Sequence, residues 1–220
     1  MNYLTHEKAY RKGRLLENRD QKDILILGAG ALGSWLVDLL ARQGYNNLSV
    51  LDFDKVEAHN FGTQNYGRPD IGRSKAQQLS QNVMRRIGVK VNPIHKKLNK
   101  SNVQSLLKGR DLVIDVFDNY ESRKIVKDFC ENSIVCIHSG MSQVGFFQIA
   151  WNEGYRVAGA TAPQNPDIEA PCDYPLASNL VMVCAGIVAE TINIYIDGGK
   201  KRNSEFWLGK MIIEVSEEEV

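Results

Sequence analysis

Paired cysteines are missing from this sequence. Its four cysteines are Cys130, Cys136, Cys172 and Cys184, and no two of them form the C-x-x-C pattern of most structural zinc sites. The first residues also lack the apolar run of an export signal, so disulfides are not expected. The sequence therefore predicts no structural zinc and leaves each cysteine as a buried or a reactive thiol.

Net charge is nearly absent as well. Lysine and arginine number 27 against 26 aspartate and glutamate, and the formal net charge is +1 at pH 7. Proteins that bind nucleic acid through bulk electrostatics are usually strongly basic, so this class is not favoured. We also see no apolar stretch that is long enough to cross a bilayer. These absences predict a cytoplasmic protein with no membrane or nucleic-acid partner.

Internal repeats and low-complexity linkers are absent too. The 220 residues suffice for one large α/β domain with a sizeable core. Residues 1–20 are polar and basic and predict an N-terminal arm, which is either solvated or reaches a partner subunit. Residues 21–220 are predicted to form a single domain.

What the sequence does have is an apolar run that leads into closely spaced glycines. Residues 24–27 are apolar, Gly28, Gly30 and Gly33 follow as G-x-G-x-x-G, and residues 34–40 have a helical pattern. A parallel strand buried on both faces fits the first part. The glycines allow a sharp turn and a close approach to phosphate, and the helix start offers free N–H groups. The pattern predicts a nucleotide-phosphate site without choosing the nucleotide, and a tight turn without a ligand stays open.

The rest of the chain alternates strands and helices. We predict strands at 48–52, 89–94, 111–116, 133–138, 144–151 and 205–214, and helices at 74–87, 102–108, 121–132 and 179–196. Long loops are expected at 53–73 and 152–178. The fold class is therefore α/β, a Rossmann-like mostly parallel sheet with helices on both faces and antiparallel strands added in the C-terminal part.

Three charged residues follow predicted strands or open a predicted helix. Asp52 stands about 20 residues after the glycines, where Rossmann-type folds bind ribose hydroxyls, and it would suit NAD equally. Lys75 opens a helix and could reach phosphates as a point charge. Asp118 follows a strand, where ligands bind in open α/β sheets. Read singly, the lysine could be a surface residue and Asp118 part of a turn.

Five separated pieces of the sequence, in order, resemble the ThiF/MoeB/HesA family, the ubiquitin-activating-type adenylyltransferases. They are residues 28–33; 51–57 with 60–61; 72–75; 111–115 with Asp118, Asn119 and Arg123; and the late helix up to 189–190. The resemblance spans about residues 20–198 and favours ATP over NAD.

The resemblance implies a set of site residues. Catalytic roles fall on Lys75, Asp118 and Cys172, and Asp118 is also the Mg²⁺ ligand. Nucleotide contacts fall on Gly28, Gly30, Gly33, Asp52, Asp54, Asn60, Gln64, Lys75 and Asn119. The cofactors implied are ATP and Mg²⁺.

The resemblance also implies a reaction and partners. The C-terminal carboxylate of a small ubiquitin-like or sulfur-carrier protein, usually ending in Gly-Gly, would be adenylated with release of pyrophosphate. Cys172 would then accept the activated carrier, or it is an unreactive thiol. A homodimer is expected. The alternatives are activation of a non-protein or nucleoside carboxylate, and a degenerate, non-catalytic subunit that binds a nucleotide or a carrier.

Several residues depart from the pattern of the family. Thr63 stands where an arginine is usual before Gln64, so Arg68 or Arg73 would have to supply that phosphate contact. The N-terminal arginine of the family has no aligned match, and Arg11 or Arg14 could serve. The zinc-binding cysteine pairs are absent, and the place of the first pair, near residues 158–161, holds no cysteine.

Two histidines lie near the predicted nucleotide site. They are His59 in the long loop and His138 at a strand end. Each is more typical of a histidine with satisfied hydrogen bonds than of a catalytic base, and adenylation needs no strong base.

Overall fold

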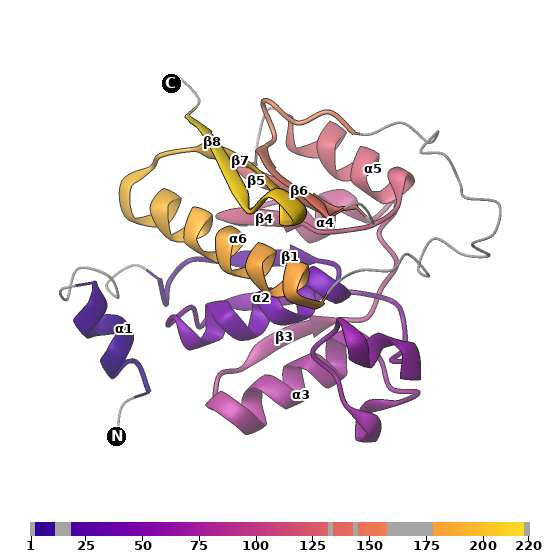
Figure 1. Cartoon of the computed structure of the whole chain (residues 1–220). Coiled ribbons are helices and arrows are strands. Elements are labelled where there is room, and N and C mark those ends of the chain that lie inside the picture. The colour runs from indigo at the N-terminus through magenta and orange to yellow at the C-terminus, as the bar shows by residue number, and fades with distance from the viewer. Residues whose placement is uncertain (1–2, 12–18, 132–133, 143–144, 158–177, 218–220) are drawn as a thin grey trace.

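An eight-stranded sheet forms the centre of the described structure. The computed structural model describes residues 3–11, 19–131, 134–142, 145–157 and 178–217, and its strands lie in the order β3-β2-β1-β4-β5-β6-β7-β8 (Figure 1). The strands are β1 (Ile24–Leu27), β2 (Leu48–Leu51), β3 (Val91–Ile94), β4 (Leu112–Asp115), β5 (Cys136–Met141), β6 (Phe146–Trp151), β7 (Arg202–Trp207) and β8 (Ile212–Glu217). Pairings from β3 through β5 are parallel and those from β5 to β8 are antiparallel, so the predicted fold class is confirmed.

Helices cover both faces of this sheet. They are α1 (Thr5–Tyr10), α2 (Ala31–Arg42), α3 (Lys75–Ile87), α4 (Val103–Leu107), α5 (Tyr120–Cys130) and α6 (Ser178–Gly198), with short 3-10 turns η1 (Ala58–Gly62), η2 (Arg68–Asp70) and η4 (Leu208–Lys210). Because β1 is buried on both faces, its residues alternate between two cores. Ile24 and Ile26 join the core under α2, α3 and α6, whereas Leu25 and Leu27 join the core under α4 and α5.

Helix α6 corrects one expectation from the sequence. Among the described helices it is long and apolar enough to cross a membrane, with 21 residues and a mean hydropathy of 1.6. Half of that stretch is buried inside the protein, where α6 runs beside α2 (Figure 1). Leu180, Cys184 and Val188 belong to the larger core. The buried half of α6 therefore packs within this fold.

The C-terminal end of the sheet also differs from the prediction. A single strand at 205–214 was expected, but β7 and β8 form an antiparallel hairpin around η4. Met211 closes the turn with a φ of 54°, a left-handed conformation that is rare for methionine, so the sequence does not indicate a turn at this position. β8 is the last strand in the sheet, and Ile213 and Val215 on it are exposed.

The N-terminal residues are tied to the fold more closely than a solvated arm would be. Arg19 is fully buried and forms ion pairs with Glu7 at 3.5 Å and Asp197 at 3.4 Å. Arg11 bonds Glu190 on α6 at 2.5 Å. The expectation of a solvated arm is therefore wrong for these two arginines, because acidic groups about 180 residues further along the chain come to lie beside them.

Candidate functional site

The carboxyl ends of three parallel strands meet where the strand order reverses. β1 has β2 on one side and β4 on the other, so the chain leaves β1 at a topological switch point. The glycine turn follows β1, Asp52 follows β2, and Asp118 lies just beyond β4. Ligands of open α/β sheets bind outside strand ends at such a point, so the predicted residues gather at the expected edge.

The three glycines of the turn have different structural reasons. Gly28 has a φ of +109°, and a Cβ there would meet the carbonyl oxygen of Val116 at 3.2 Å. A Cβ on Gly33 would lie 2.0 Å from the carbonyl oxygen of Gly28, so helix and strand can pack only around a glycine. Nothing lies within 4 Å of a Cβ on Gly30, where α2 begins without a side-chain cap. The helix start above Gly30 is therefore open to an anion.

Asp52 is buried beside this turn. One carboxylate oxygen accepts the N–H of Ala29 and the other accepts the N–H of Asp54, both at 2.7 Å. Burial raises the pKa of Asp52, and these two hydrogen bonds and the charge of Lys75 only partly oppose that rise. Each oxygen keeps a second acceptor site, so the carboxylate can still bind ribose hydroxyls.

Lys75 is held next to Asp52 by the backbone around it. It is a buried residue at the start of α3; its backbone N–H bonds the carbonyl of Asp54 at 2.9 Å, and its Nζ lies 3.4 Å from that residue's carboxylate. Tyr66, which sequence reasoning missed, donates its hydroxyl to the carbonyl oxygen of Ala29 at 2.8 Å. Tyr66 thus links the long loop to the glycine turn, and no local sequence pattern marks it.

Asn60 and Gln64 lie together at η1. The side-chain oxygen of Asn60 accepts the N–H of Glu57 at 2.8 Å, so this buried amide caps its own turn. The side-chain oxygen of Gln64 is buried without a hydrogen-bond partner among the described residues. The carbonyl of Thr63 accepts the indole N–H of Trp35 at 2.9 Å, which fixes the backbone before Gln64. Gln64 therefore keeps a free acceptor, whereas Asn60 has its oxygen engaged.

Asp118 and Asn119 follow β4 on the exposed side of the turn into α5. Asn119 caps α5 by accepting the N–H of Ser122 at 2.9 Å. No group of three potential metal ligands occurs in the described part of the chain. Mg²⁺ in nucleotide sites commonly uses one or two carboxylates plus substrate phosphates, so Asp118 alone fits this kind of binding.

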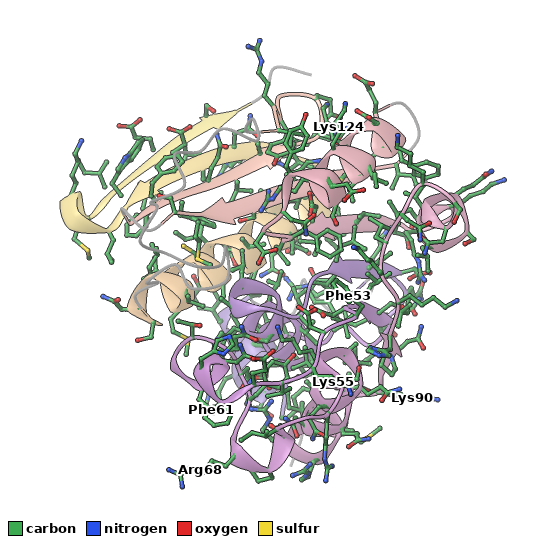
Figure 2. All side chains as sticks on the ribbon, turned by 90° about the vertical axis from the view of Figure 1, so that its right-hand side faces the viewer. Phe53, Lys55, Phe61, Arg68, Lys90 and Lys124 are labelled. Carbon is green, nitrogen blue, oxygen red and sulfur yellow. The ribbon has the colours of Figure 1, made fainter. Side chains whose placement is uncertain are left out.

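The arginines that could replace the missing arginines of the family differ in their exposure and in their partners. Arg73 is exposed, with its guanidinium 3.4 Å from the side-chain oxygen of Gln78. Arg68 points outward at the lower margin of the face seen in Figure 2. Arg11 is engaged with its own chain, as described above. Arg14 and Cys172 lie outside the described residues, as do residues 158–161.

Asp115 belongs to one of the pieces that carry the family resemblance, but the sequence assigned it no role at the site, although a charge at the end of an apolar run is a signal. Asp115 is fully buried, and its carboxylate lies 2.8 Å from the Nδ1 of His138. The other ring nitrogen of His138 lies 2.7 Å from the side-chain oxygen of Asn152. The hydrogen bonds expected for His138 are therefore confirmed. His59 is half exposed, 3.5 Å from Glu57.

Together, the sheet order, the glycine turn and the acid after β2 define a Rossmann-like α/β protein of the nucleotide-binding type. Residues 10–208 match the ThiF family. Because the match covers most of the chain, the protein belongs to the ThiF family.

Named relatives agree with this family. The chain is 33% identical over 133 residues to the SAMP-activating enzyme E1 of Haloferax volcanii, which covers 59% of this chain and 48% of that protein. It is 35% identical over 112 residues to a probable adenylyltransferase/sulfurtransferase MoeZ of Mycobacterium tuberculosis, 48% of this chain and 27% of that one. The matched segments thus span half or less of these relatives.

A solved structure shares the fold over nearly the whole chain. Escherichia coli MccB, solved with ATP, superposes with a TM-score of 0.76 over 98% of this chain and 72% of MccB, at 15% identity. At that identity, the comparison establishes a common fold.

Proposed function

We propose that this protein is an ATP-dependent adenylyltransferase that activates the C-terminal carboxylate of a small ubiquitin-like or sulfur-carrier protein. The family match over residues 10–208 carries the proposal, and the names of the relatives support the reaction and the kind of carrier. The proposal includes a carrier that ends in Gly-Gly, Mg²⁺ as the companion of ATP, and a cytoplasmic homodimer.

The open helix start at Gly30 supports a role in holding phosphates. In the proposed complex, Asp52 accepts the ribose hydroxyls and Lys75 turns its charge from Asp54 to the phosphates. Asp118 holds Mg²⁺, which neutralises phosphate charge. These residues bind and orient the reactants, which is the larger part of what such a reaction requires from a protein.

The proposed bond changes are simple. A carboxylate oxygen of the carrier forms a bond to the α-phosphorus of ATP, the bond between that phosphorus and the bridging oxygen breaks, and its electron pair leaves with pyrophosphate. The product is a carrier acyl-adenylate. A second step is part of the proposal: the thiolate of Cys172 attacks the acyl carbon and AMP leaves.

Pyrophosphate exchange tests the first step. Labelled pyrophosphate should enter ATP only when a suitable carrier is present. Lys75→Ala and Asp118→Ala should abolish exchange, while Lys90→Ala, on an exposed lysine shown in Figure 2, should leave it unchanged. Exchange that survives in both site variants would show that the site is misplaced. Failure to bind ATP at all would favour a non-catalytic subunit, and exchange driven only by small acids would favour a non-protein substrate.

A trapping experiment tests the second step. The protein, ATP and an active carrier are mixed and separated without reductant, and a covalent adduct should form with the wild type and not with Cys172→Ser. Full downstream transfer by Cys172→Ser would refute the covalent role and leave the adenylation step standing.

A further inference from the structure

Next to the segment that carries Asp118 lies a cluster of polar side chains that the proposed reaction does not use, and all of them except the partly exposed Arg123 are buried. We call it the His138 cluster. Its members come from β4, α5, β5 and the segment after β6, and they are Asp115, Arg123, His138, Asn152 and Tyr155. Burying polar groups is unfavourable unless they are fully bonded, so such a cluster demands a close fit.

His138 is at the centre of this cluster. A carboxylate has only acceptor sites, so the Nδ1 of His138 donates to Asp115 at 2.8 Å. Its Nε2 lies 2.7 Å from the side-chain oxygen of Asn152. The ring stacks on Tyr155 with centroids 4.0 Å apart and an angle of 9° between the planes. With both ring nitrogens and one face in contact, the imidazole has one orientation.

The cluster is joined to the glycine turn and to Asp118 through the backbone. The second carboxylate oxygen of Asp115 accepts the N–H of Phe117 at 3.1 Å. Between them, Val116 donates its N–H to Leu27 at 3.1 Å and forms the wall against which the glycine turn packs. Asp118 is the residue after Phe117, so the direction of its carboxylate depends on how Asp115 is held.

The segment of residues 115–123 is also bonded to the His138 cluster at its other end, through Arg123. Arg123, in the first turns of α5, donates to the carbonyl of Ser139 at 2.7 Å and to the hydroxyl of Tyr155 at 2.9 Å. Burial lowers the pKa of Arg123, but the negative charges of Asp115 and, more weakly, Asp118 contribute to a net rise. Residues 115–123 therefore leave the cluster and return to it, with Asp118 between the two attachments.

We propose that His138 is a positioning residue for Asp118: by donating to Asp115, it holds the turn after β4 in the geometry that binds the Mg²⁺ of MgATP. The proposal rests on the proposed function for the metal role of Asp118. His138 touches neither nucleotide nor metal and acts only through Asp115. Loss of such an outer partner typically weakens metal binding or activity about 10- to 100-fold.

Two substitutions separate this role from simple packing. His138→Asn places an amide N–H near the position of Nδ1 and keeps the bond to Asp115. His138→Gln places its amide near Nε2, keeps the contact with Asn152 and loses the bond to Asp115. Asp115→Ala is a further test, because it removes both acceptor oxygens and with them the bonds to the Nδ1–H and to the Phe117 N–H.

The assay is carrier-dependent pyrophosphate exchange by the full chain over a range of Mg²⁺ concentrations, with melting temperatures for every variant. We expect His138→Gln and Asp115→Ala to raise the half-saturating Mg²⁺ concentration about 10-fold, His138→Asn to stay near the wild type, and the KM for the carrier to stay unchanged in all three. In an Asp118→Asn background, binding of MgATP should not weaken further on adding His138→Gln.

The outcomes distinguish the two proposals. If the wild type shows no exchange with any carrier, the proposed function fails. If the wild type is active and His138→Asn and His138→Gln lose activity equally, or if melting temperatures fall while the Mg²⁺ dependence is unchanged, the positioning role is refuted. Should His138→Gln not fold, Asp115→Ala against the wild type decides by the same measurement.

Discussion

Gly33 and Gly30 lie in the same turn, but an added methyl group should affect different properties of the protein: mainly its stability at Gly33 and mainly its ATP affinity at Gly30. In Gly33→Ala, the new Cβ would lie 2.0 Å from the carbonyl oxygen of Gly28, so helix and strand must separate by more than about 1 Å to reach ordinary contact. Such overpacking costs about 3 kcal/mol. The better helix propensity of alanine offsets about 1 kcal/mol of this. The remaining loss of about 2 kcal/mol lowers the melting temperature by about 4–8 °C for a chain of this size.

Gly30→Ala should instead affect the ligand. Nothing lies within 4 Å of its Cβ, but its φ of −79° and ψ of −147° lie about 30° outside the β region, so we expect the free energy of unfolding to fall by about 1 kcal/mol, less than in Gly33→Ala. The methyl group would occupy the space through which backbone N–H groups approach phosphate. Losing one hydrogen bond to a charged group weakens ATP binding about 10- to 100-fold.

Urea unfolding and calorimetric titration with ATP check both variants. Gly186→Ala, on the exposed side of α6 with open space around its Cβ, serves as the control for an added methyl. Unchanged ATP affinity in Gly30→Ala would refute the phosphate site above this residue. Unchanged stability in Gly33→Ala would refute the packing argument.

Three further predictions follow from buried groups. Arg19→Ala should lower the free energy of unfolding by about 2 kcal/mol in chemical denaturation, because it removes the ion pairs of Arg19 with Glu7 and Asp197. The loss is no larger because these two partners are partly exposed and water can hydrate them. Burial raises the pKa of Asp52 above 3.8, so the folded state holds that proton more tightly than the unfolded chain. The contribution of Asp52 to the free energy of unfolding should therefore decrease as the pH rises from 3.8 through the raised pKa of the folded state. The urea midpoint should fall more steeply over this pH range in the wild type than in Asp52→Asn. Cys130, Cys136 and Cys184 are buried, so pulsed alkylation followed by mass spectrometry should modify them only on unfolding.

The parallel half of the fold could be predicted from the sequence because its signals are local. β1 is a continuous apolar run that ends in glycine, and Ser74 and Gly88 mark the two ends of α3 as expected for a cap and a left-handed residue. The glycine turn and the acid after β2 follow from spacing alone. Their meeting at one edge follows from the rule that parallel strands share their carboxyl ends.

The features that could not be predicted from the sequence depend mostly on partners far along the chain. Arg19 is buried because Asp197 comes to lie beside it, and neither residue signals the other locally. Asp115 and His138 are bonded although they come from different strands. The capping role of Asn60 depends on the exact bend of η1, which no periodicity describes. These features arise from tertiary packing, and no local pattern in the sequence signals them.

The hairpin that completes the sheet has a consequence for how the molecule behaves in crowded conditions. Among the residues that the structure describes, β8 is the last strand of the sheet, so one side of its backbone pairs with no described strand, and Ile213 and Val215 on it are exposed. Such an edge is a template for another strand. Glu214 and Glu217 interrupt it with negative charge, so two copies that approach edge to edge bring like charges together. Neutralising these two glutamates would therefore remove a safeguard against aggregation without touching the nucleotide site.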